Sequence, residues 1–564
     1  MSRITIEGTQ MLPEDALRLF ADAAAAAVAA RYPHAAPVAV SFEAPRRPEF
    51  GDFATNVAFS LAKAARRSPQ EIAVDIAADV RAALPAVDRV FSSIEPTAGF
   101  INLRLAPGIW QGVVELILHR GASFGELPNN GKRVSLEFGS ANPTGPLVVV
   151  QGRSMSLGDA LVKSMRFCGY DVFVEWIIND SGGQLDTLGR SLYARYRQIY
   201  DAGYPFPGDG YPGDYLAPIA QSIADRDGTK WVDCDPEKWL PVFARIGRDE
   251  LVARQRETAH RFGVEYDLWQ SERELHDTGK VREGIDRLRE LGHTFEDDGA
   301  LFFRATHFGD DKDRVLVRRD GRPTYFAMDV AYHYQKLQRA DRVIDILGPD
   351  HHGYIGRLKG LAAALGFDPS HLDVLIAQQV TLMRGSEQVS MSKRAGHIVT
   401  LDEILDEVGI DAARFFFVLP AAESPLTFDL KLAVEQTNEN PVYYVQYGHA
   451  RIVSVLRNAD AGDVAAARTN RALESLTHAA ELALARRLAE FPDVVRGVVA
   501  YLAPHRLARY ARDVASDFHQ FYTECRILGG EPATRVARLS LCLATQTVLA
   551  RTLALVGVSA PDSM

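Results

Sequence analysis

The order strand, turn, helix, strand between residues 133 and 180 constrains the fold more than any other feature of the sequence. RVSLEFGSAN is predicted to be a short strand entering a turn, SMSLGDALVKSMRFCGY a helix, and DVFVEWIIND the next strand. This βαβ order is typical of a parallel sheet, whose first turn usually contacts a nucleotide. RVIDILGPDHHGY and HLDVLIAQQVTLM predict further parallel strands. We therefore expect an α/β domain in the middle of the chain.

The chain has 564 residues, which is too many for a single core, so we expect several domains. Residues 1–107 predict a small α+β module, with a helix over Pro13–Arg31, a second helix from about Thr55, and an alternating strand, SIEPTAGFINLRL, bent at Gly99. The α/β domain is expected over 108–428, with a helical insertion at about 190–300. Residues 429–564 predict a helical bundle, in which 460–470 form a polar loop.

Charge and cysteine usage exclude several classes of protein. The net charge of −10 argues against nonspecific coating of nucleic acid, but it leaves room for a local basic face that binds a shaped RNA. The four cysteines form no CxxC pair, which favours a reducing cytoplasm over a zinc site or a disulfide framework. The alanine-rich run at 23–30 is too short to span a bilayer, and no signal pattern precedes it.

Four segments are candidates for chemistry, and each has a plainer interpretation. The turn after Phe138 offers backbone N–H groups to an anion, or is an ordinary βα turn. GPDHHG at 348–353 lies at a strand end, but no third or fourth ligand nearby supports a metal. The loop GSEQVSMSKRAGHIVTL carries two adjacent cations, or is a solvated basic turn. NENPVYYVQYGHARI presents tyrosines that suit unstacked RNA bases, or that belong to a core.

In this order the segments resemble the arginyl-tRNA synthetases of class I. The resemblance covers essentially the whole chain and rests on PEFGDFATNVAFSLAK, LEFGSANPTGPL, WIINDSGGQ, GDDKDRVLVRRDGRPTYFAMDVAYH, DHHGYIGRLKG, MSKRAGHIVTLDEILDEVGIDAARFFF, ENPVYYVQY and the terminal VGVSAPDSM. It implies a multidomain α/β plus α fold: an N-terminal module for the tRNA elbow, a Rossmann-like catalytic domain, and an all-α anticodon-binding bundle. It also implies an arginine–tRNA ligase, cytoplasmic and monomeric, with no membrane contact.

The resemblance carries site residues over to this sequence. Arginine is expected to contact Glu137, Asn142, Glu272, Tyr325 and Asp329; ATP is expected to contact Ala141, Pro143, Gly145, Gly152, Asp350, His352, Gly353, Met391 and Ser392. The implied catalytic residues are Gln151, Arg153, Lys393 and Arg394, and the implied tRNA contacts are Asn56, Tyr443, Tyr447, Arg451 and Met564. The chemistry agrees, because a guanidinium requires carboxylates in fork geometry, and Tyr325 and Asp329 share one helical face. Mg²⁺ is expected to accompany ATP without a protein-bound metal site.

Two segments depart from the family pattern. Val148-Val149-Val150-Gln151, which we expect to be buried strand, replaces the usual His-x-Gly-His, and Ser390 replaces a lysine. Those histidines would donate to the ATP phosphates, the glycine would allow close approach of adenine, and the lysine would neutralise pyrophosphate. Losing one such donor typically costs roughly 10²–10³ in rate. Gln151, Arg153, Lys393 and Arg394 remain as substitutes.

These departures leave two alternatives open beside the ligase. The first is a tRNA-binding or regulatory paralogue that no longer activates arginine. The second is a ligase that passes activated arginine to an acceptor other than tRNA, although such an enzyme has no need of the C-terminal bundle. By resemblance we also expect activation to depend on bound tRNA, a form of induced fit.

Overall fold

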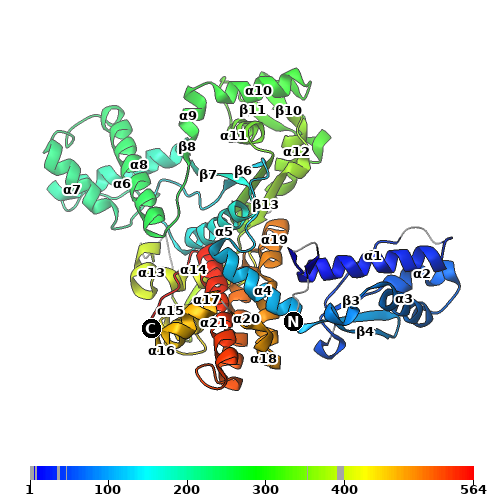
Figure 1. Ribbon diagram of the computed structural model, residues 1–564. Helices are drawn as coiled ribbons and strands as arrows, with labels where there is room; N and C mark the ends of the chain where they lie inside the picture. The colour runs from blue at the N-terminus through cyan, green and yellow to red at the C-terminus, as the bar shows by residue number, and fades with distance from the viewer. Residues whose placement is uncertain are drawn as a thin grey trace.

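A computed structural model describes residues 5–6, 9–34, 38–45, 47–351, 353–389, 399–469 and 471–564. His352, Ser390, Met391, Ser392, Lys393 and Arg394, which carry several of the sequence predictions, lie outside these residues. Figure 1 shows the N-terminal module at one side, the α/β domain with its insertion at the top, and a helical bundle below them.

The N-terminal module is an antiparallel sheet in the order β3-β5-β4 covered by helices. Its elements are α1 (Pro13–Arg31), β3 (Phe53–Thr55), α2 (Val57–Ala65), α3 (Pro69–Ala83), β4 (Phe91–Thr97) and β5 (Phe100–Leu105); β1 (Thr5–Ile6) and β2 (Thr9–Gln10) precede them. The single bent strand predicted for 93–105 is wrong. Gly99, at a φ of +88°, turns the chain into a hairpin between β4 and β5.

A five-stranded parallel sheet, in the order β13-β12-β6-β7-β8, forms the centre of the molecule. Its strands are β6 (Arg133–Glu137), β7 (Asp171–Ile178), β8 (Leu268–Ser271), β12 (Arg342–Leu347) and β13 (Leu372–Ile376). Helix α5 (Val149–Phe167) crosses from β6 to β7. The chain leaves β6 toward β7 and β8 and returns on the other side at β12. In sheets of this kind such a reversal predicts a ligand site at the carboxyl ends of the two flanking strands, here β6 and β12.

The segment at 190–300 is not helical throughout. Helices α6 (Gly183–Tyr200), α7 (Leu216–Asp227) and α8 (Pro236–Arg261) come first, but β8 then joins the main sheet. A second unit follows, with α9 (Glu272–Asp277), α10 (Lys280–Glu290), β9 (Thr294–Asp297), β10 (Ala300–Phe303), β11 (Arg314–Val317) and α11 (Tyr325–Arg339). β8 is a strand because it pairs with β7, which is distant in sequence. β9, β10 and β11 pair with one another in a small antiparallel sheet, although their sequences show only a weak strand pattern.

The remaining catalytic elements lead from the sheet to the bundle. They are α12 (Tyr354–Ala364), β14 (Val380–Arg384), β15 (Glu387–Gln388), α13 (Leu401–Val408), α14 (Ile410–Val418), β16 (Leu426–Asp429) and α15 (Leu430–Val434). Arg414 of α14, 1% exposed, contacts Asp159 of α5 and donates to the carbonyls of Phe262 (2.9 Å) and Val556 (3.2 Å). One buried guanidinium thus joins the sheet domain, its insertion and the bundle.

The bundle consists of α16 (Pro441–Asn458), α17 (Ala461–Thr469), α18 (Ala479–Ala489), α19 (Phe491–Tyr501), α20 (His505–Glu524) and α21 (Pro532–Val556), with α4 (Pro107–Arg120) packed against it. The polar loop predicted for 460–470 is wrong, because α17 forms there and packs on α21. Helix α21 is long and apolar enough to cross a membrane, but 72% of its most apolar window is buried as the core of this bundle.

Candidate active site

The carboxyl ends of β6, β7 and β8 bring the predicted arginine-binding residues together with residues that the sequence did not single out. Glu272 opens α9 directly after β8, and Ser181 follows β7. The Ser181 hydroxyl donates to Glu272 Oε2 at 2.6 Å. Tyr325, the first residue of α11, places its hydroxyl against Gly182, where a Cβ would lie 1.9 Å from it. Gly182 is therefore a contact that only a glycine permits.

Glu272 and Asp329 form an anionic site. Burial raises the pKa of Glu272 to about 6, and the negative charge of Asp329 adds to this effect. Burial likewise raises the pKa of Asp329 to about 6, with a further contribution from Glu137. Within the described part of the chain neither carboxylate forms an ion pair. His333, Arg357 and His351 offset part of the negative charge at Asp329 without pairing with it. Two carboxylates that repel each other and form no ion pair favour a cationic ligand.

Glu137 belongs to a buried network that the sequence analysis missed. Its Oε2 accepts from Lys336 Nζ at 2.5 Å, and its Oε1 accepts from the Ser140 hydroxyl at 2.9 Å. Lys336 is fully buried and also donates to Asp345 Oδ1 at 2.6 Å, while His333 contacts the other oxygen of Asp345 at 3.1 Å. Glu137 is thus balanced by a cation beneath the site, whereas Glu272 and Asp329 are not. The spacing of Tyr325, Asp329 and Lys336 on one helix was the sequence signal that could have predicted this network.

Asn142 and the nucleotide turn lie beside this site. The Asn142 side-chain oxygen accepts from Asn179 Nδ2, which follows β7, at 2.9 Å. Ala141, Pro143 and Gly145 continue the same turn, and Gly145 faces the Tyr215 hydroxyl. Asp350 and Gly353 are exposed just after β12. These five of the nine predicted ATP contacts therefore lie at the carboxyl edge of the sheet, as expected for residues that follow its strands.

The segment 148–151 is the start of a helix and not the buried strand that we predicted. Val148 is the N-cap of α5, and its N–H donates to Gln151 Oε1 at 3.3 Å. Val148 forms an isolated bridge with Thr400, and the N–H of Leu401 donates to the Leu147 carbonyl at 2.8 Å. Three consecutive valines favour a strand by propensity, but the helix that follows and its contact with 400–401 override this local preference.

The structure gives no support to the prediction that Arg153 acts on phosphate. Its side chain is fully buried. The guanidinium donates to four backbone carbonyls, those of Gln378 (2.8 Å), Gln379 (3.4 Å), Ala421 (2.9 Å) and Ser424 (2.7 Å). Burial lowers the pKa of Arg153 to about 10, so it remains a cation that fastens two loops. A sequence indicates the charge of such a residue but not the direction of its side chain.

Gly152 also has a packing role. A Cβ on it would lie 2.7 Å from Leu401 and 3.0 Å from Phe417. The absence of a side chain therefore allows α5 to approach α13 and α14. These contacts explain the glycine by packing and give no support to the predicted ATP contact. Gln151 remains half-buried, and in the described residues its amide nitrogen has no hydrogen-bond partner.

The predicted RNA contacts of the bundle form one surface on α16. Tyr443 and Tyr447 stack with ring centroids 5.8 Å apart, and Arg451 donates to the Tyr447 hydroxyl at 2.7 Å. Arg451 also lies over the ring of Tyr522, at 4.8 Å from its centroid. Asn56, at the start of α2, is exposed on the separate N-terminal module.

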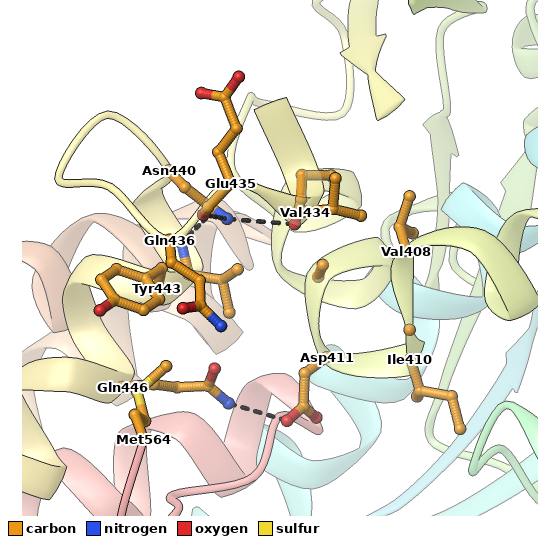
Figure 2. A pocket seen from close by; sticks show the side chains of 14 residues that line it. Val408, Ile410, Asp411, Val434, Glu435, Gln436, Asn440, Tyr443, Gln446 and Met564 are labelled. Carbon is orange, nitrogen blue, oxygen red and sulfur yellow. Dashed lines mark hydrogen bonds between the residues drawn. The ribbon is translucent and has the colours of Figure 1, made fainter. Parts of the chain in front are cut away.

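A hollow of about 580 Å³ adjoins this surface. Figure 2 shows Tyr443, Gln446 and Met564 on one side of it and Asp411 opposite, with Gln446 donating to Asp411 at 2.8 Å. Met564 is 56% exposed. The C-terminal tail therefore brings Met564 next to Tyr443, although the two are far apart in sequence.

Comparisons with known proteins agree with this architecture. Three family profiles match: "Arginyl tRNA synthetase N terminal domain" at residues 17–105, "tRNA synthetases class I (R), catalytic domain" at 250–417, and "DALR anticodon binding domain" at 445–564. The parallel sheet, the site at its carboxyl edge and these matches define a class I aminoacyl-tRNA synthetase fold.

Individual relatives narrow this class. The chain is 44% identical to an arginine–tRNA ligase of Syntrophotalea carbinolica, over 93% of this chain and 95% of the relative, and 46% identical to one of Desulforudis audaxviator, over 93% of each. A solved putative arginyl-tRNA synthetase from Campylobacter jejuni matches with a TM-score of 0.75 at 28% identity, covering 82% of this chain and 100% of that one. The chain belongs to the arginyl-tRNA synthetase family.

Proposed function

We propose that the chain is an arginine–tRNA ligase. The observation that carries the proposal is the pair of half-buried carboxylates Glu272 and Asp329, neither of which forms an ion pair within the described residues. A guanidinium satisfies both, since it is always charged and presents donors in a fork. Tyr325 adds a hydroxyl at the same place. Lysine offers a single point charge and citrulline offers none, so both would bind more weakly.

The proposed reaction has two steps. An oxygen of the arginine carboxylate attacks the α-phosphorus of ATP in line; the bond to the bridging oxygen breaks, and pyrophosphate leaves. A hydroxyl of the terminal ribose of tRNA then attacks the carbonyl carbon of arginyl-adenylate, loses its proton, and AMP leaves. Mg²⁺ enters with ATP. The contribution of the protein is positioning and charge neutralisation.

On the nucleotide side, the proposal assigns phosphate contacts to backbone and to few side chains. The first turn of α5 offers main-chain N–H groups whatever its side chains are, and the helix dipole adds to them. Gln151 supplies a neutral amide donor. Lys393 and Arg394 are proposed as the cations that replace the missing lysine. Arg153 has no part in this assignment, because its guanidinium already donates to backbone carbonyls of two loops.

The proposed RNA partner is tRNA(Arg), bound by the two outer domains. The stacked pair Tyr443 and Tyr447, with Arg451 beside it, suits an unstacked base and its phosphate. Met564 borders the adjoining hollow, and Asn56 serves the elbow contact on the N-terminal module. A monomeric, cytoplasmic enzyme is part of the same proposal.

The test is arginylation of bulk tRNA with labelled arginine by the purified chain. We expect product from the unmodified chain and none above background from Asp329→Asn. Asp286→Asn, at an exposed carboxylate of α10 paired only with Arg289, is the matched control and should keep full activity. Absence of arginyl-tRNA from a folded chain that binds tRNA would favour the non-activating paralogue. Consumption of arginine and ATP without charged tRNA would favour another acceptor.

A further inference from the structure

Helix α8 of the insertion contacts three separate segments of the proposed active site. Near its middle, Arg248 Nη1 donates to Asp180 Oδ2 at 2.9 Å. Seven residues later, Gln255 Nε2 donates to the carbonyls of Asn142 at 3.0 Å and Gly145 at 2.9 Å. Further along, the Thr258 hydroxyl donates to Asp402 at 2.6 Å, at the start of α13. One helix therefore spans the arginine side, the nucleotide turn and the start of α13.

The contact of Arg248 leads to the arginine pocket through Asp180. Asp180 is 1% exposed, and its carboxylate accepts from the Ser271 hydroxyl at 2.8 Å and from the N–H of Arg273 at 3.1 Å. Glu272 lies between these two residues. Asp180 thus holds the Ser271 side chain on one side of Glu272 and the Arg273 backbone on the other. Arg248 compensates the buried negative charge of Asp180. Losing this arginine would leave a buried carboxylate without its cation, which destabilises a fold.

The contact of Gln255 fixes the nucleotide turn. Gln255 is 1% exposed, and its amide nitrogen serves both carbonyls of the turn, while its Oε1 is buried without a partner in the described structure. The opposite amide orientation would set an oxygen against two carbonyl oxygens, so the donor orientation is fixed. Tyr215, also from the insertion, donates to the Thr144 carbonyl at 2.7 Å. Two side chains of the insertion therefore hold residues 142–145.

We propose that α8 is a positioning helix, and that Arg248 and Gln255 are positioning residues that set the arginine pocket and the nucleotide turn at a fixed separation. Seven residues are two helical turns, so both side chains leave one face of α8, about 10 Å apart along its axis. In-line attack requires the arginine carboxylate and the α-phosphorus to lie about 3–3.5 Å apart, and an error of 1 Å can cost roughly a hundredfold in rate. This inference rests on the proposed function.

The test separates the two substrates. Arg248→Met should raise KM for arginine about tenfold or more, with a much smaller change for ATP, because it loosens Glu272. Gln255→Met should raise KM for ATP and lower the single-turnover rate of adenylate formation about tenfold or more. Arginine affinity in calorimetry should fall less than the affinity for ATP, because Asn142 borders the arginine site but Glu272 keeps its own supports. Arg248→Lys, which can still reach Asp180, should restore part of the arginine affinity.

Arg245→Met, at an exposed position of the same helix, and Gln221→Met, on the surface of α7, are the matched controls. Equal changes of both KM values in both variants, or changes no larger than those of the controls, would overturn the proposal. Arginine and ATP-analogue binding by calorimetry keeps the test independent of turnover. Substrate-selective losses of binding in a chain that charges no tRNA would uphold the positioning role and reject the ligase.

Discussion

Arg153 provides the sharpest test of the structure against the sequence. The sequence places this arginine in the nucleotide segment and predicts a phosphate contact, whereas the structure gives it a purely architectural position. We expect Arg153→Met to destabilise the fold, with any loss of activity following from the disturbed loops. Methionine keeps much of the buried volume and removes all the donors, so the variant isolates the hydrogen bonds.

The magnitude follows from the four carbonyls. Those of Gln379 and Ala421 also accept from the N–H groups of Leu426 and Ser424, so they keep a partner without the guanidinium. The described structure provides no other donor for the carbonyls of Gln378 and Ser424. A buried acceptor left unsatisfied costs about 1–3 kcal/mol. Gln378 is half-buried and Ser424 is exposed, so water can replace part of the lost donors, and we expect a loss of about 1–3 kcal/mol in total.

The assay is urea unfolding combined with hydrogen exchange. The amides of residues 421–426 should lose protection first, because their loop loses its anchor. Arg166→Met, at a half-exposed arginine of the same helix, is the control and should cost at most about 1 kcal/mol. If Arg153→Met keeps the unfolding midpoint and the loop protection of the unmodified chain but loses adenylate formation, then Arg153 acts on the nucleotide and the structural argument fails.

Four further predictions concern the substrates and the nucleotide segment. Asp329→Ala should weaken arginine binding by about 2–5 kcal/mol in calorimetry, and unchanged affinity would reject the pocket. Burial raises the pKa of both Glu272 and Asp329 to about 6, and both bind a cation as anions. KM for arginine should therefore rise from pH 7 to pH 5 by about tenfold if one carboxylate controls binding and about a hundredfold if both do; a flat profile would contradict this. Arginine-dependent ATP–pyrophosphate exchange should require tRNA, and exchange without it would refute induced fit. The unmodified chain should form arginyl-tRNA in a single turnover; product only after Val148→His/Val150→Gly/Gln151→His would show that the valines disable the site.

The sequence by itself determined several of the elements and the sheet edge at which the proposed site residues lie. Apolar runs and helical spacing located β6, β7, β12 and β13, and the helix at Pro13–Arg31 has the predicted bounds. Because parallel strands end at a common edge, residues following several strands had to meet there. Tyr325 and Asp329 followed from their four-residue spacing on α11. These are local properties, and the order of residues along the chain is enough to predict them.

Only the tertiary structure decided how those residues are used. Valines at 148–150 favour a strand locally, but packing makes them the start of a helix. The charge of Arg153 was evident from sequence, whereas its burial under two loops depends on residues more than 200 positions away. The roles of Asp180, Arg248 and Gln255 likewise exist only where α8 meets the sheet. Hydrogen bonds between distant segments depend on the path of the whole chain, and so no local pattern encodes them.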